Sequence, residues 1–363
     1  MRFLALVLLL CISGAFAAPP AFAPVKPGRA LSFPADFGAH PEFRTEWWYV
    51  TGWLQTAAGK PLGFQVTFFR SRTEHDPANP SAFAPHQLVI GHAAVSDPAV
   101  GRLVHAERSA REGFGLAWAK AGNTDLKLDD WRMTRAPDGS YRVLVRSNEL
   151  TLELALTPTQ PTLVQGENGY SRKGPAPQHA SYYYSQPHLK VSGTAGRAGA
   201  AGPVTGSAWL DHEWSSEALQ PEASGWDWVG ANLDDGSALM AFQVRKKGNS
   251  KKGNNQEGDK LWAHATVRDR DGKITRYAPE AVSFTPRAQW RSPRTNADYP
   301  VATTITTGTT RWQIAPLQND QELDSRRSTG AVYWEGAVTV ARDGVPAGRG
   351  YLEMTGYVRP IKL

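Results

Sequence analysis

The sequence of 363 residues contains one cysteine, Cys11, and that residue lies in an N-terminal segment that we expect to be removed. A chain with one cysteine forms no internal disulfide and offers no thiolate cluster for zinc or for redox chemistry. Past residue 20, no apolar run reaches the roughly 18 residues that a membrane-spanning helix needs. No amphipathic helical pattern persists for three turns there either, so we expect a soluble product that is not helical.

Several catalytic signatures are also missing. No Gly-x-Ser-x-Gly elbow occurs, because the glycines of residues 169–174 stand one position too far apart. His212 and Glu213 begin like the helix of a zinc protease, but Ser216 occupies the place of the second histidine. No glycine loop sits on a strand-to-helix turn to bind phosphate. The sequence therefore predicts neither a metal nor another cofactor.

Charge is only mildly unbalanced, at a formal net +6. No basic stripe interleaved with aromatic residues is present, so we expect no nucleic-acid partner. The local basic cluster of residues 245–247 with Lys251 and Lys252 is embedded in Gly, Asn and Ser. We interpret it as a solvated hairpin loop, with contact to anionic lipid or glycan as the alternative.

The N-terminus has the features of an export signal. Arg2 precedes an apolar run over residues 3–12, and the small-residue motif of residues 15–17 suits cleavage. We therefore predict a signal peptide over residues 1–17, an extended proline-rich lead-in over residues 18–32, and a periplasmic or secreted location.

What the sequence does contain is aromatic and arranged in short alternating runs. Residues 46–54 and 62–70 flank a turn at residues 58–61 and predict a hairpin, and a second hairpin follows through residues 234–236. Many strands at short spacing predict an all-β fold, a meandering barrel or half-barrel of the kind that can enclose one ligand.

The strand pattern occurs twice in the sequence. Five segments of the first half recur in order in the second: Trp47-x-Tyr49 as Trp226-x-Trp228, 64–66 as 242–244, His92-Ala93 as His264-Ala265, Tyr141 as Tyr299, and 209–214 as 351–356. Collinear matches of this kind indicate an internal duplication. We place two homologous domains at residues 33–216 and 217–363.

The polar run of residues 211–213 distinguishes the first copy from the second. Because side chains alternate along a strand, Asp211 and Glu213 project to one face and His212 to the other. In the second copy the slot of His212 holds Met354, whereas Asp211 is matched by Glu353. His212 and Glu213 are thus specific to the first copy, and if both are functional the site must involve the domain junction as well as a barrel interior.

Structural roles compete with catalytic roles at these positions. His212 can be a core histidine bonded to the backbone, to Tyr183 or to Tyr184. Asp211 can pair with Arg70 or Arg72.

The acids beside the tryptophans are open to the same alternative. Glu46 and Asp227 can simply bond indole N–H groups. His92 and His264 occur in both copies, so we interpret them as structural.

Five segments together resemble one known family. They are residues 46–49 (Glu-Trp-Trp-Tyr), 64–70, 182–189, 210–215 (Leu-Asp-His-Glu-Trp-Ser) and 225–228 (Gly-Trp-Asp-Trp). They are similar to the AttH/CrtC-type proteins, a secreted "predicted hydrolase" group related to carotenoid 1,2-hydratases, over about Glu46 to Tyr357. The resemblance implies two tandem lipocalin-like (calycin-type) β-barrel domains, hydration of an isolated double bond as the chemistry of one branch, and a transporter permease as a candidate partner.

Hydration of an alkene requires a strong acid, stabilisation of a carbocation and a positioned water, and this chain has residues suited to each task. The candidate catalytic residues are His212, Asp211, Glu213 and Asp227. The candidate ligand-binding residues are Trp47, Trp48, Tyr183, His188, Trp214, Trp226 and Trp228. We expect a hydratase-like or hydrolase-like monomer that acts on a hydrophobic small molecule, with its site in or beside the first domain near the junction.

Two alternatives remain open at this point. A lipocalin-like cavity can carry or chaperone an apolar ligand without chemistry. A glycan-active enzyme is the other, because Asp211 and Glu213 would stand roughly 6.5 to 7 Å apart on one strand face.

Overall fold

The computed structural model describes residues 22–247 and 260–361. The predicted signal peptide, and Lys251 and Lys252 of the basic cluster, lie outside these ranges. Within them the helical segments are two short 3-10 helices, η1 (Ala35–Phe37) and η3 (Pro279–Ala281). Neither has the length and apolar character that crossing a membrane would require.

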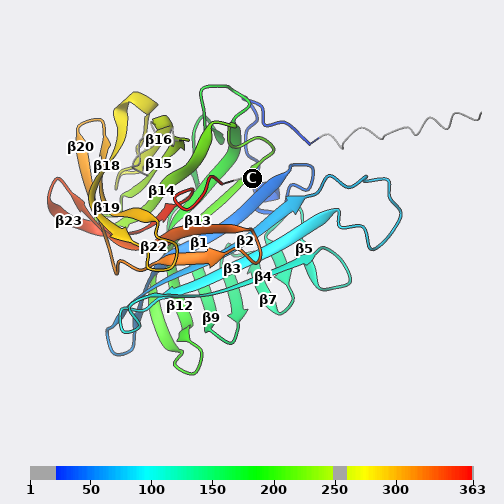
Figure 1. Cartoon of the computed structure of the whole chain (residues 1–363), viewed down its shortest axis with the longest axis horizontal. Helices are drawn as coiled ribbons and strands as arrows, with labels where there is room; N and C mark the ends of the chain where they lie inside the picture. The colour runs from blue at the N-terminus through cyan, green and yellow to red at the C-terminus, as the bar shows by residue number, and fades with distance from the viewer. Residues whose placement is uncertain (1–21, 248–259, 362–363) are drawn as a thin grey trace, which may run out of the picture.

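The strands form two large antiparallel sheets (Figure 1). The first sheet contains β1 (Thr45–Thr56), β2 (Pro61–Arg72), β3 (Gln87–Ser96), β4 (Leu103–Arg111), β5 (Ala117–Ala119), β6 (Asp125–Leu128), β7 (Trp131–Arg135), β8 (Tyr141–Arg146), β9 (Leu150–Pro158), β10 (Leu163–Val164), β11 (Tyr170–Arg172), β12 (Ala180–Arg197) and β13 (Gly202–Ser215). The second contains β14 (Ala223–Leu233), β15 (Ala238–Lys246), β16 (Lys260–Arg268), β17 (Ile274–Tyr277), β18 (Val282–Arg291), β19 (Asp298–Thr307), β20 (Thr310–Pro316), β21 (Glu322–Ser325), β22 (Ala331–Arg342) and β23 (Val345–Met354).

Both sheets follow the same strand order. The first runs β4-β3-β2-β1-β13-β12-β9-β8-β7-β6-β5, and the second runs β17-β16-β15-β14-β23-β22-β20-β19-β18. In each, the opening hairpins lie beside the last strand of the same copy. The first sheet curls until Arg108 on β4 binds Asp129 and Asp130 of the β6–β7 turn. The predicted all-β fold with two lipocalin-like barrel domains is confirmed.

The strand register corrects one part of the internal alignment. Tyr49 pairs with Thr67 across β1 and β2, and Trp228 pairs with Phe242 across β14 and β15. Thr67 is therefore the counterpart of Phe242, and the predicted match of Phe64 to Phe242 is wrong. The second hairpin is four residues shorter, from 228 to 242 against 49 to 67, so the recurring Phe-Gln-Val motif lies on opposite faces of the two copies.

Alternation along the strands divides most of the buried apolar residues among three large clusters. One fills the first barrel around Trp48, Phe64 and Leu210. A second fills the second barrel, with Met354 among its members. The third lies between the sheets and includes Trp228. Successive side chains point to opposite faces, so each strand near the junction contributes to a barrel interior and to the contact between sheets. At this junction β1 of the first sheet contacts β22 and β23 of the second (Figure 1).

Candidate functional site

A cavity of about 370 Å³ lies where the two sheets face each other. The first sheet contributes walls from β1, β2, β3 and β13, and the second contributes walls from β14, β15, β22 and β23. Its aromatic walls are formed by Trp47, Phe69, Trp226, Trp228, Phe242 and Tyr333. The volume lies near the lower end of the roughly 300–1,000 Å³ range of ligand pockets.

The cavity has a buried floor and an open rim. On the floor, Tyr49, His92 and Glu335 are buried. Toward the other end of the same strands, the rim residues Ser71 and Thr329 are partly or fully exposed to solvent. The buried polar groups of the floor therefore lie at the closed end of the cavity, away from the polar residues of the rim.

Two carboxyl groups face each other on the floor. Glu335 of β22 and Glu353 of β23 are directly opposite partners in the antiparallel ladder. Tyr49 Oη donates to Glu335 Oε2 at 2.8 Å, and Trp226 Nε1 donates to Glu353 Oε1 at 3.1 Å. Within the described part of the chain, Glu335 Oε1 has no hydrogen-bond partner.

Burial, together with the charge of the other glutamate, raises the pKa of Glu335 well above its ordinary value. Burial also raises the pKa of Glu353. The hydrogen bond from Trp226 lowers this pKa, whereas the negative charges of Asp211 and Glu213 raise it further. Two carboxylates this close in an apolar setting cannot both ionise at low cost. The pair therefore retains a proton at neutral pH.

Asp211 also lines the cavity, on β13. Its carboxylate accepts hydrogen bonds from Tyr183 Oη at 2.7 Å, Ser185 Oγ at 2.6 Å and Trp209 Nε1 at 2.7 Å. Burial raises the pKa of Asp211 to about 7, while these three donors act in the opposite direction. The expected pairing with Arg70 is wrong, because Arg70 binds Glu46 inside the first barrel.

Glu213 and a buried lysine form an ion pair at the cavity wall. Lys173 Nζ lies 2.8 Å from Glu213 Oε1 and 3.2 Å from Ser171 Oγ. The ammonium group also lies over the rings of Tyr183 and Phe242, at 4.7 and 4.3 Å from their centroids. The Lys173 ammonium group is therefore paired with a carboxylate, faces two aromatic rings and lies on the same cavity wall as Asp211.

A chain of hydrogen bonds leads from the cavity floor toward solvent. Tyr333 Oη lies 2.5 Å from His92 Nδ1, and His92 Nε2 lies 2.9 Å from Ser328 Oγ. Ser328 in turn binds Glu107. Burial lowers the pKa of His92 to about 3, so its imidazole is neutral at neutral pH. The interpretation of His92 as structural did not place it at the cavity, whereas the structure puts its side chain on the cavity floor.

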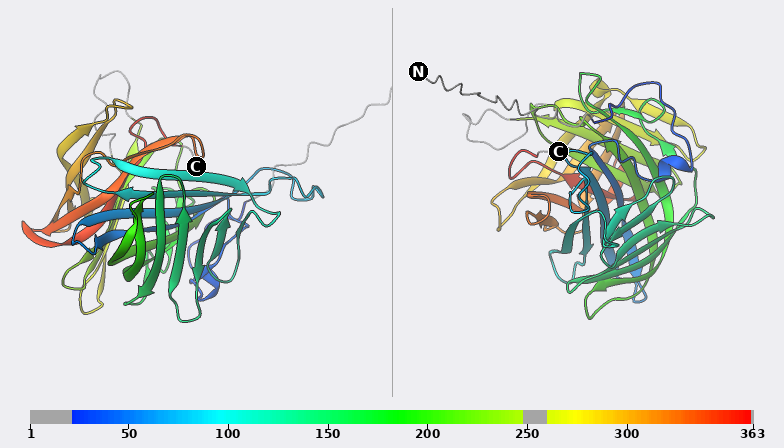
Figure 2. Two further views of the ribbon diagram at one scale, coloured as in Figure 1. Left: turned by 90° about the horizontal axis from the view of Figure 1, so that it is seen from below. Right: turned by 90° about the vertical axis from the view of Figure 1, so that its right-hand side faces the viewer.

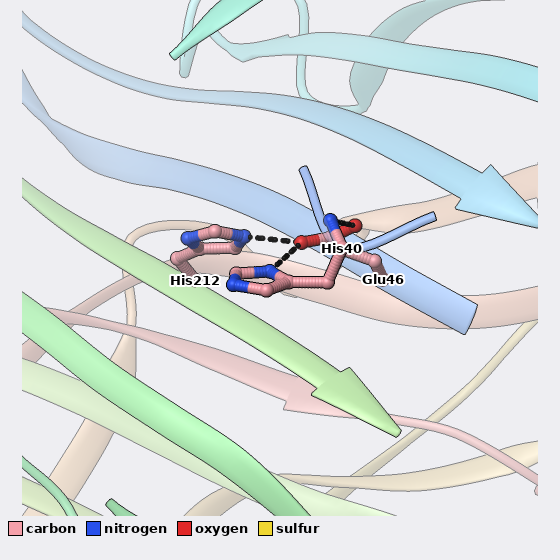
Figure 3. A group of neighbouring side chains, drawn as sticks. All are labelled: His40, Glu46 and His212. Atoms are coloured by element: carbon pink, nitrogen blue, oxygen red, sulfur yellow. Dashed lines mark hydrogen bonds and ion pairs between the residues drawn. The ribbon is translucent and has the colours of Figure 1, made fainter. Parts of the chain in front are cut away.

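His212 occupies the interior of the first barrel, on the face of β13 that points away from the cavity (Figure 3). Its Nε2 lies 2.8 Å from Glu46 Oε1, and its Nδ1 lies 3.0 Å from Tyr184 Oη. Trp48 stacks on the imidazole with ring centroids 4.4 Å apart. Burial lowers the pKa of His212 to about 4, although Glu46 favours the charged form.

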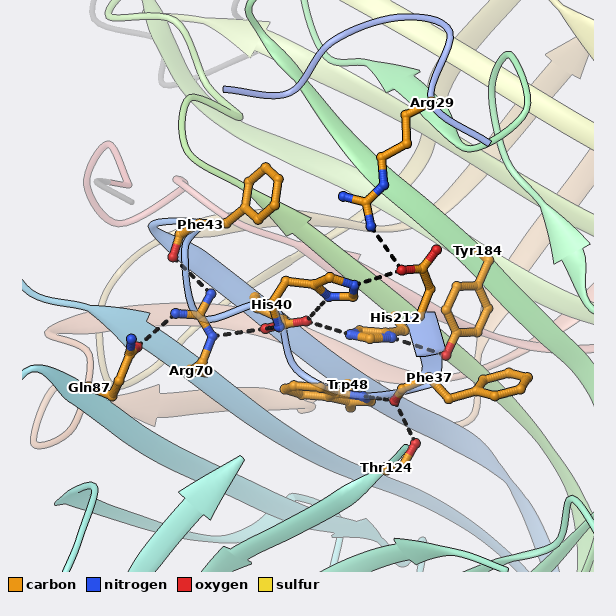
Figure 4. Close-up of polar contacts among 12 residues, drawn as sticks. Arg29, Phe37, His40, Phe43, Trp48, Arg70, Gln87, Thr124, Tyr184 and His212 are labelled. Carbon is orange, nitrogen blue, oxygen red and sulfur yellow. Dashed lines mark hydrogen bonds and ion pairs between the residues drawn. The ribbon is translucent and has the colours of Figure 1, made fainter. Parts of the chain in front are cut away.

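Glu46 is the centre of this buried network (Figure 3), and Figure 4 shows its partners His40, Arg70 and His212. Its carboxylate also binds His40 Nδ1 at 2.7 Å and Arg70 Nε at 2.8 Å. Burial opposes ionisation of Glu46, but the bonds from His212 and His40 and the charge of Arg70 outweigh burial and lower its pKa. The other nitrogen of His40 lies 3.0 Å from Asp36 Oδ1. Both ring nitrogens of His40 face carboxylates, and these contacts favour the imidazolium and raise the pKa of His40 against the effect of burial.

His40, Glu46 and His212 also form a group with potential metal ligands. Tetrahedral zinc bound at about 2.0–2.1 Å keeps its ligand atoms about 3.3 Å apart. Here the two nitrogens lie 2.7 and 2.8 Å from one shared oxygen, and the second ring nitrogens bind Asp36 and Tyr184. These separations are those of hydrogen bonds, so the cluster fits a polar network that fixes the barrel interior.

The remaining predicted site residues divide between the cavity and the scaffold. Trp47, Trp226 and Trp228 line the cavity. Trp48 and Trp214 lie in the first barrel, Tyr183 lies behind Asp211, and His188 binds Ser237 on a different side of the junction. Asp227 points into the second copy, where it binds Gln243, Arg245 and Tyr357. The structure thus brings Asp211 and Glu213 to the cavity but not His212 or Asp227. The alternative in which Glu46 bonds an indole N–H group differs from its partners given above, which are His40, Arg70 and His212.

Sequence reasoning missed three cavity groups: Glu335, Lys173 and the position of His92 on the cavity floor. Glu335 lies two positions after Tyr333, so both side chains project to the same face of β22. Glu335 is the counterpart of Ser185, because Ser185 pairs with Asp211 and Glu335 pairs with Glu353, the residue that matches Asp211 in the second copy. Strand parity combined with the internal duplication would have placed Glu335 on the same face as Glu353. No comparable signal marks Lys173, which lies just after the short strand β11.

The repeated sheet order and the cavity between two barrel walls define a two-domain lipocalin-like protein with a cavity at the domain junction. The chain belongs to the AttH-like family, whose model matches residues 24–357.

Solved structures share this architecture. A candidate AttH protein from Nitrosomonas europaea is 60% identical, with a TM-score of 0.85 over 93% of this chain and 100% of that chain. Kievitone hydratase from Nectria haematococca aligns with a TM-score of 0.68 at 12% identity, over 93% of this chain and 96% of that one. CghA with Sch210972 aligns with a TM-score of 0.52 at 13% identity, over 87% and 89%. The last two similarities concern the fold alone. No curated protein matches the sequence.

Proposed function

We propose that this protein is a hydratase-like enzyme that adds water to an unsaturated, apolar molecule bound in the junction cavity. The observation that carries the proposal is the Glu335–Glu353 carboxyl pair on the buried floor of an aromatic-walled cavity. A carboxylic acid that keeps its proton near neutral pH, on the floor of an aromatic-walled cavity, is suited to protonate carbon.

The proposed reaction balances as the net addition of one water. The proton of the carboxyl pair moves to one alkene carbon, the π electrons form the new C–H bond, and the other carbon becomes a cation. The indole faces of Trp226 and Trp228 and the carboxylate left behind stabilise that cation. A water molecule then forms the C–O bond and returns a proton to the carboxyl pair or to Asp211.

Among the predicted catalytic residues, this proposal assigns proton transfer to Asp211 and keeps Glu213 as the partner of Lys173. His212 and Asp227 are proposed to support the walls, since their side chains point away from the cavity. The similarity in fold to kievitone hydratase supports the proposal of a hydratase, although the activity in that name belongs to that protein. Export is part of the proposal and rests on the sequence of residues 1–17.

The test begins with the natural ligand. The protein is produced in a periplasm and denatured, and the released small molecules are identified by mass spectrometry. Each unsaturated candidate is then incubated with the protein in H₂¹⁸O. We expect the wild type to form an alcohol that carries ¹⁸O, and Glu335→Gln or Glu353→Gln to reduce its rate at least 100-fold. Glu280→Gln, at an exposed glutamate of η3, is the control.

A carrier without chemistry is the second candidate, because aromatic walls alone suffice to bind an apolar molecule. It predicts that the same ligand is recovered unchanged from H₂¹⁸O and that both glutamine variants still bind it. That result would reject the hydratase. An ¹⁸O label found on a cleaved sugar would instead support the glycan-active alternative.

A further inference from the structure

Three of the exposed large hydrophobic side chains gather in two neighbouring loops. Phe83, in the β2–β3 connection, is 67% exposed. Phe114 and Leu116, in the β4–β5 connection, are 56% and 52% exposed. The two phenyl rings lie side by side, with centroids 5.2 Å apart. Figures 1 and 2 show both loops protruding at the same end of the molecule.

Arginine side chains lie against aromatic rings at this end. The guanidinium of Arg111 lies 4.9 Å from the ring centroid of Phe83 and 4.8 Å from that of Phe114. A second set lies nearby, where Arg44 and Arg72 flank the ring of Phe22 at 5.3 and 5.4 Å. Rings paired with guanidinium groups carry both an apolar body and a charged end.

These loops adjoin the rim of the junction cavity. The β2–β3 connection leaves β2 directly after Arg72, beside the rim residue Ser71. The β4–β5 connection leaves β4 after Arg111, which pairs with Leu88 on β3, two positions from the lining residue Ile90. Arg44 itself lines the rim. The exposed rings and the opening of the aromatic cavity therefore share one end of the protein.

We propose that loops 73–86 and 112–116 form a phospholipid-docking surface that sets the cavity rim against a membrane. Phe83 and Phe114 are exposed in two protruding loops, which suits insertion among headgroups better than reception of a protein segment. Side chains with an apolar body and a charged or polar end are favoured at the level of the headgroups. An apolar ligand that dissolves poorly in water is concentrated in a bilayer, so this surface places its source beside the cavity.

The local charges are mixed, because Glu74 and Asp76 lie in the same loop and Glu74 approaches Arg44 at 3.4 Å. Docking is therefore carried by the rings, with the guanidinium groups at headgroup depth. This inference goes beyond the proposed reaction, since it concerns how the protein meets its ligand and holds for an enzyme or a carrier.

The test uses vesicle sedimentation. The chain from residue 18 onward is mixed with vesicles of phosphatidylcholine and phosphatidylglycerol, in 0.15 M and in 1 M salt, and bound protein is measured after centrifugation. We expect wild-type protein to bind in both salts, and the double variant Phe83→Ser, Phe114→Ser to bind at least fivefold more weakly. Val345→Ser is the matched control, because Val345 is 66% exposed on the β22–β23 hairpin, outside the two loops.

Circular dichroism establishes that each variant is folded. Absence of wild-type binding, equal binding by the double variant, or equal loss in the Val345 control would each overturn the proposal. So would binding that disappears in 1 M salt, because that would assign the contact to charge alone. The measurement needs no substrate, so its failure is distinguishable from failure of the proposed reaction.

Discussion

Glu335 and Glu353 stand directly opposite each other on β22 and β23, at the floor of a cavity with aromatic walls. Like charges at opposite positions of an antiparallel pair are destabilising, and burial increases their cost. Each of the two acids accepts a hydrogen bond from one aromatic side chain, Tyr49 or Trp226. The arrangement favours a shared proton, which is the property that a proton donor to carbon requires.

Glu353→Gln should reduce the loss of stability at alkaline pH. The pKa values of both glutamates are raised above the ordinary 4.5. The unfolded chain therefore releases these protons first, and stability falls as pH rises from about 4.5 through the raised values. Removal of one acid should make the protein more stable at pH 8 by roughly 1–3 kcal/mol, with little change near pH 4.5. Urea denaturation of the wild type and the variant at both pH values checks this. If the free energy of unfolding changed between the two pH values by the same amount in both proteins, a shared proton would be contradicted.

Tyr49→Phe should raise the pKa of Glu335 further. The Tyr49 hydroxyl donates to the Glu335 carboxylate and so favours its ionised form. Without this donor, the infrared band of the protonated carboxyl should persist to higher pH than in the wild type. Tyr141→Phe is the control, because that tyrosine lies in the core of the first barrel. A band that titrates at the same pH in all three proteins would exclude the proposed bond as an influence on Glu335.

Glu46→Gln should destabilise the first barrel strongly. Its carboxylate neutralises the buried Arg70 and His40 and accepts a bond from His212. Loss of one partner from a buried ion pair typically costs about 3–5 kcal/mol, because the other charge is left uncompensated. Chemical denaturation measures the change against the exposed control Glu280→Gln. A loss below about 1 kcal/mol would show that the network is not needed for stability.

The contribution of His40 should depend on pH in a defined direction. Burial opposes its charge, but its bonds to Asp36 and Glu46 outweigh burial and raise its pKa above 6.5. A raised pKa in the folded state gives stability that is complete below 6.5 and lost as pH rises through the raised value. His40→Gln should therefore cost more at pH 6 than at pH 9, by about 1–2 kcal/mol. Equal costs at the two pH values would indicate that His40 is neutral.

His212→Met, which installs the residue of the second copy, should lower stability while binding in the cavity is retained. Tyr184 and Glu46 would each lose a buried hydrogen-bond partner, at a cost of about 1–3 kcal/mol. Quenching of the cavity tryptophans by the natural ligand measures binding. Full loss of binding or turnover in a folded variant would return His212 to the catalytic group.

Local patterns in the sequence predict the fold class and the division of side chains between the two faces of each strand. Alternation of polar and apolar residues requires only the geometry of one strand, so it separated His212 from Asp211 and Glu213 without knowledge of their neighbours. Recurring motifs in both halves likewise indicated two copies of one strand order.

Which face of β13 lines the cavity depends on how the two sheets pack against each other. The side of β13 that carries Asp211 and Glu213 is covered by the second sheet, and this contact joins residues more than a hundred positions apart, such as Tyr49 and Glu335. The cavity and the carboxyl pair on its floor both depend on this packing. The same packing leaves His212 on the opposite face of β13, inside the first barrel. No local pattern specifies how two sheets face each other, because that arrangement depends on the fit of both surfaces at once.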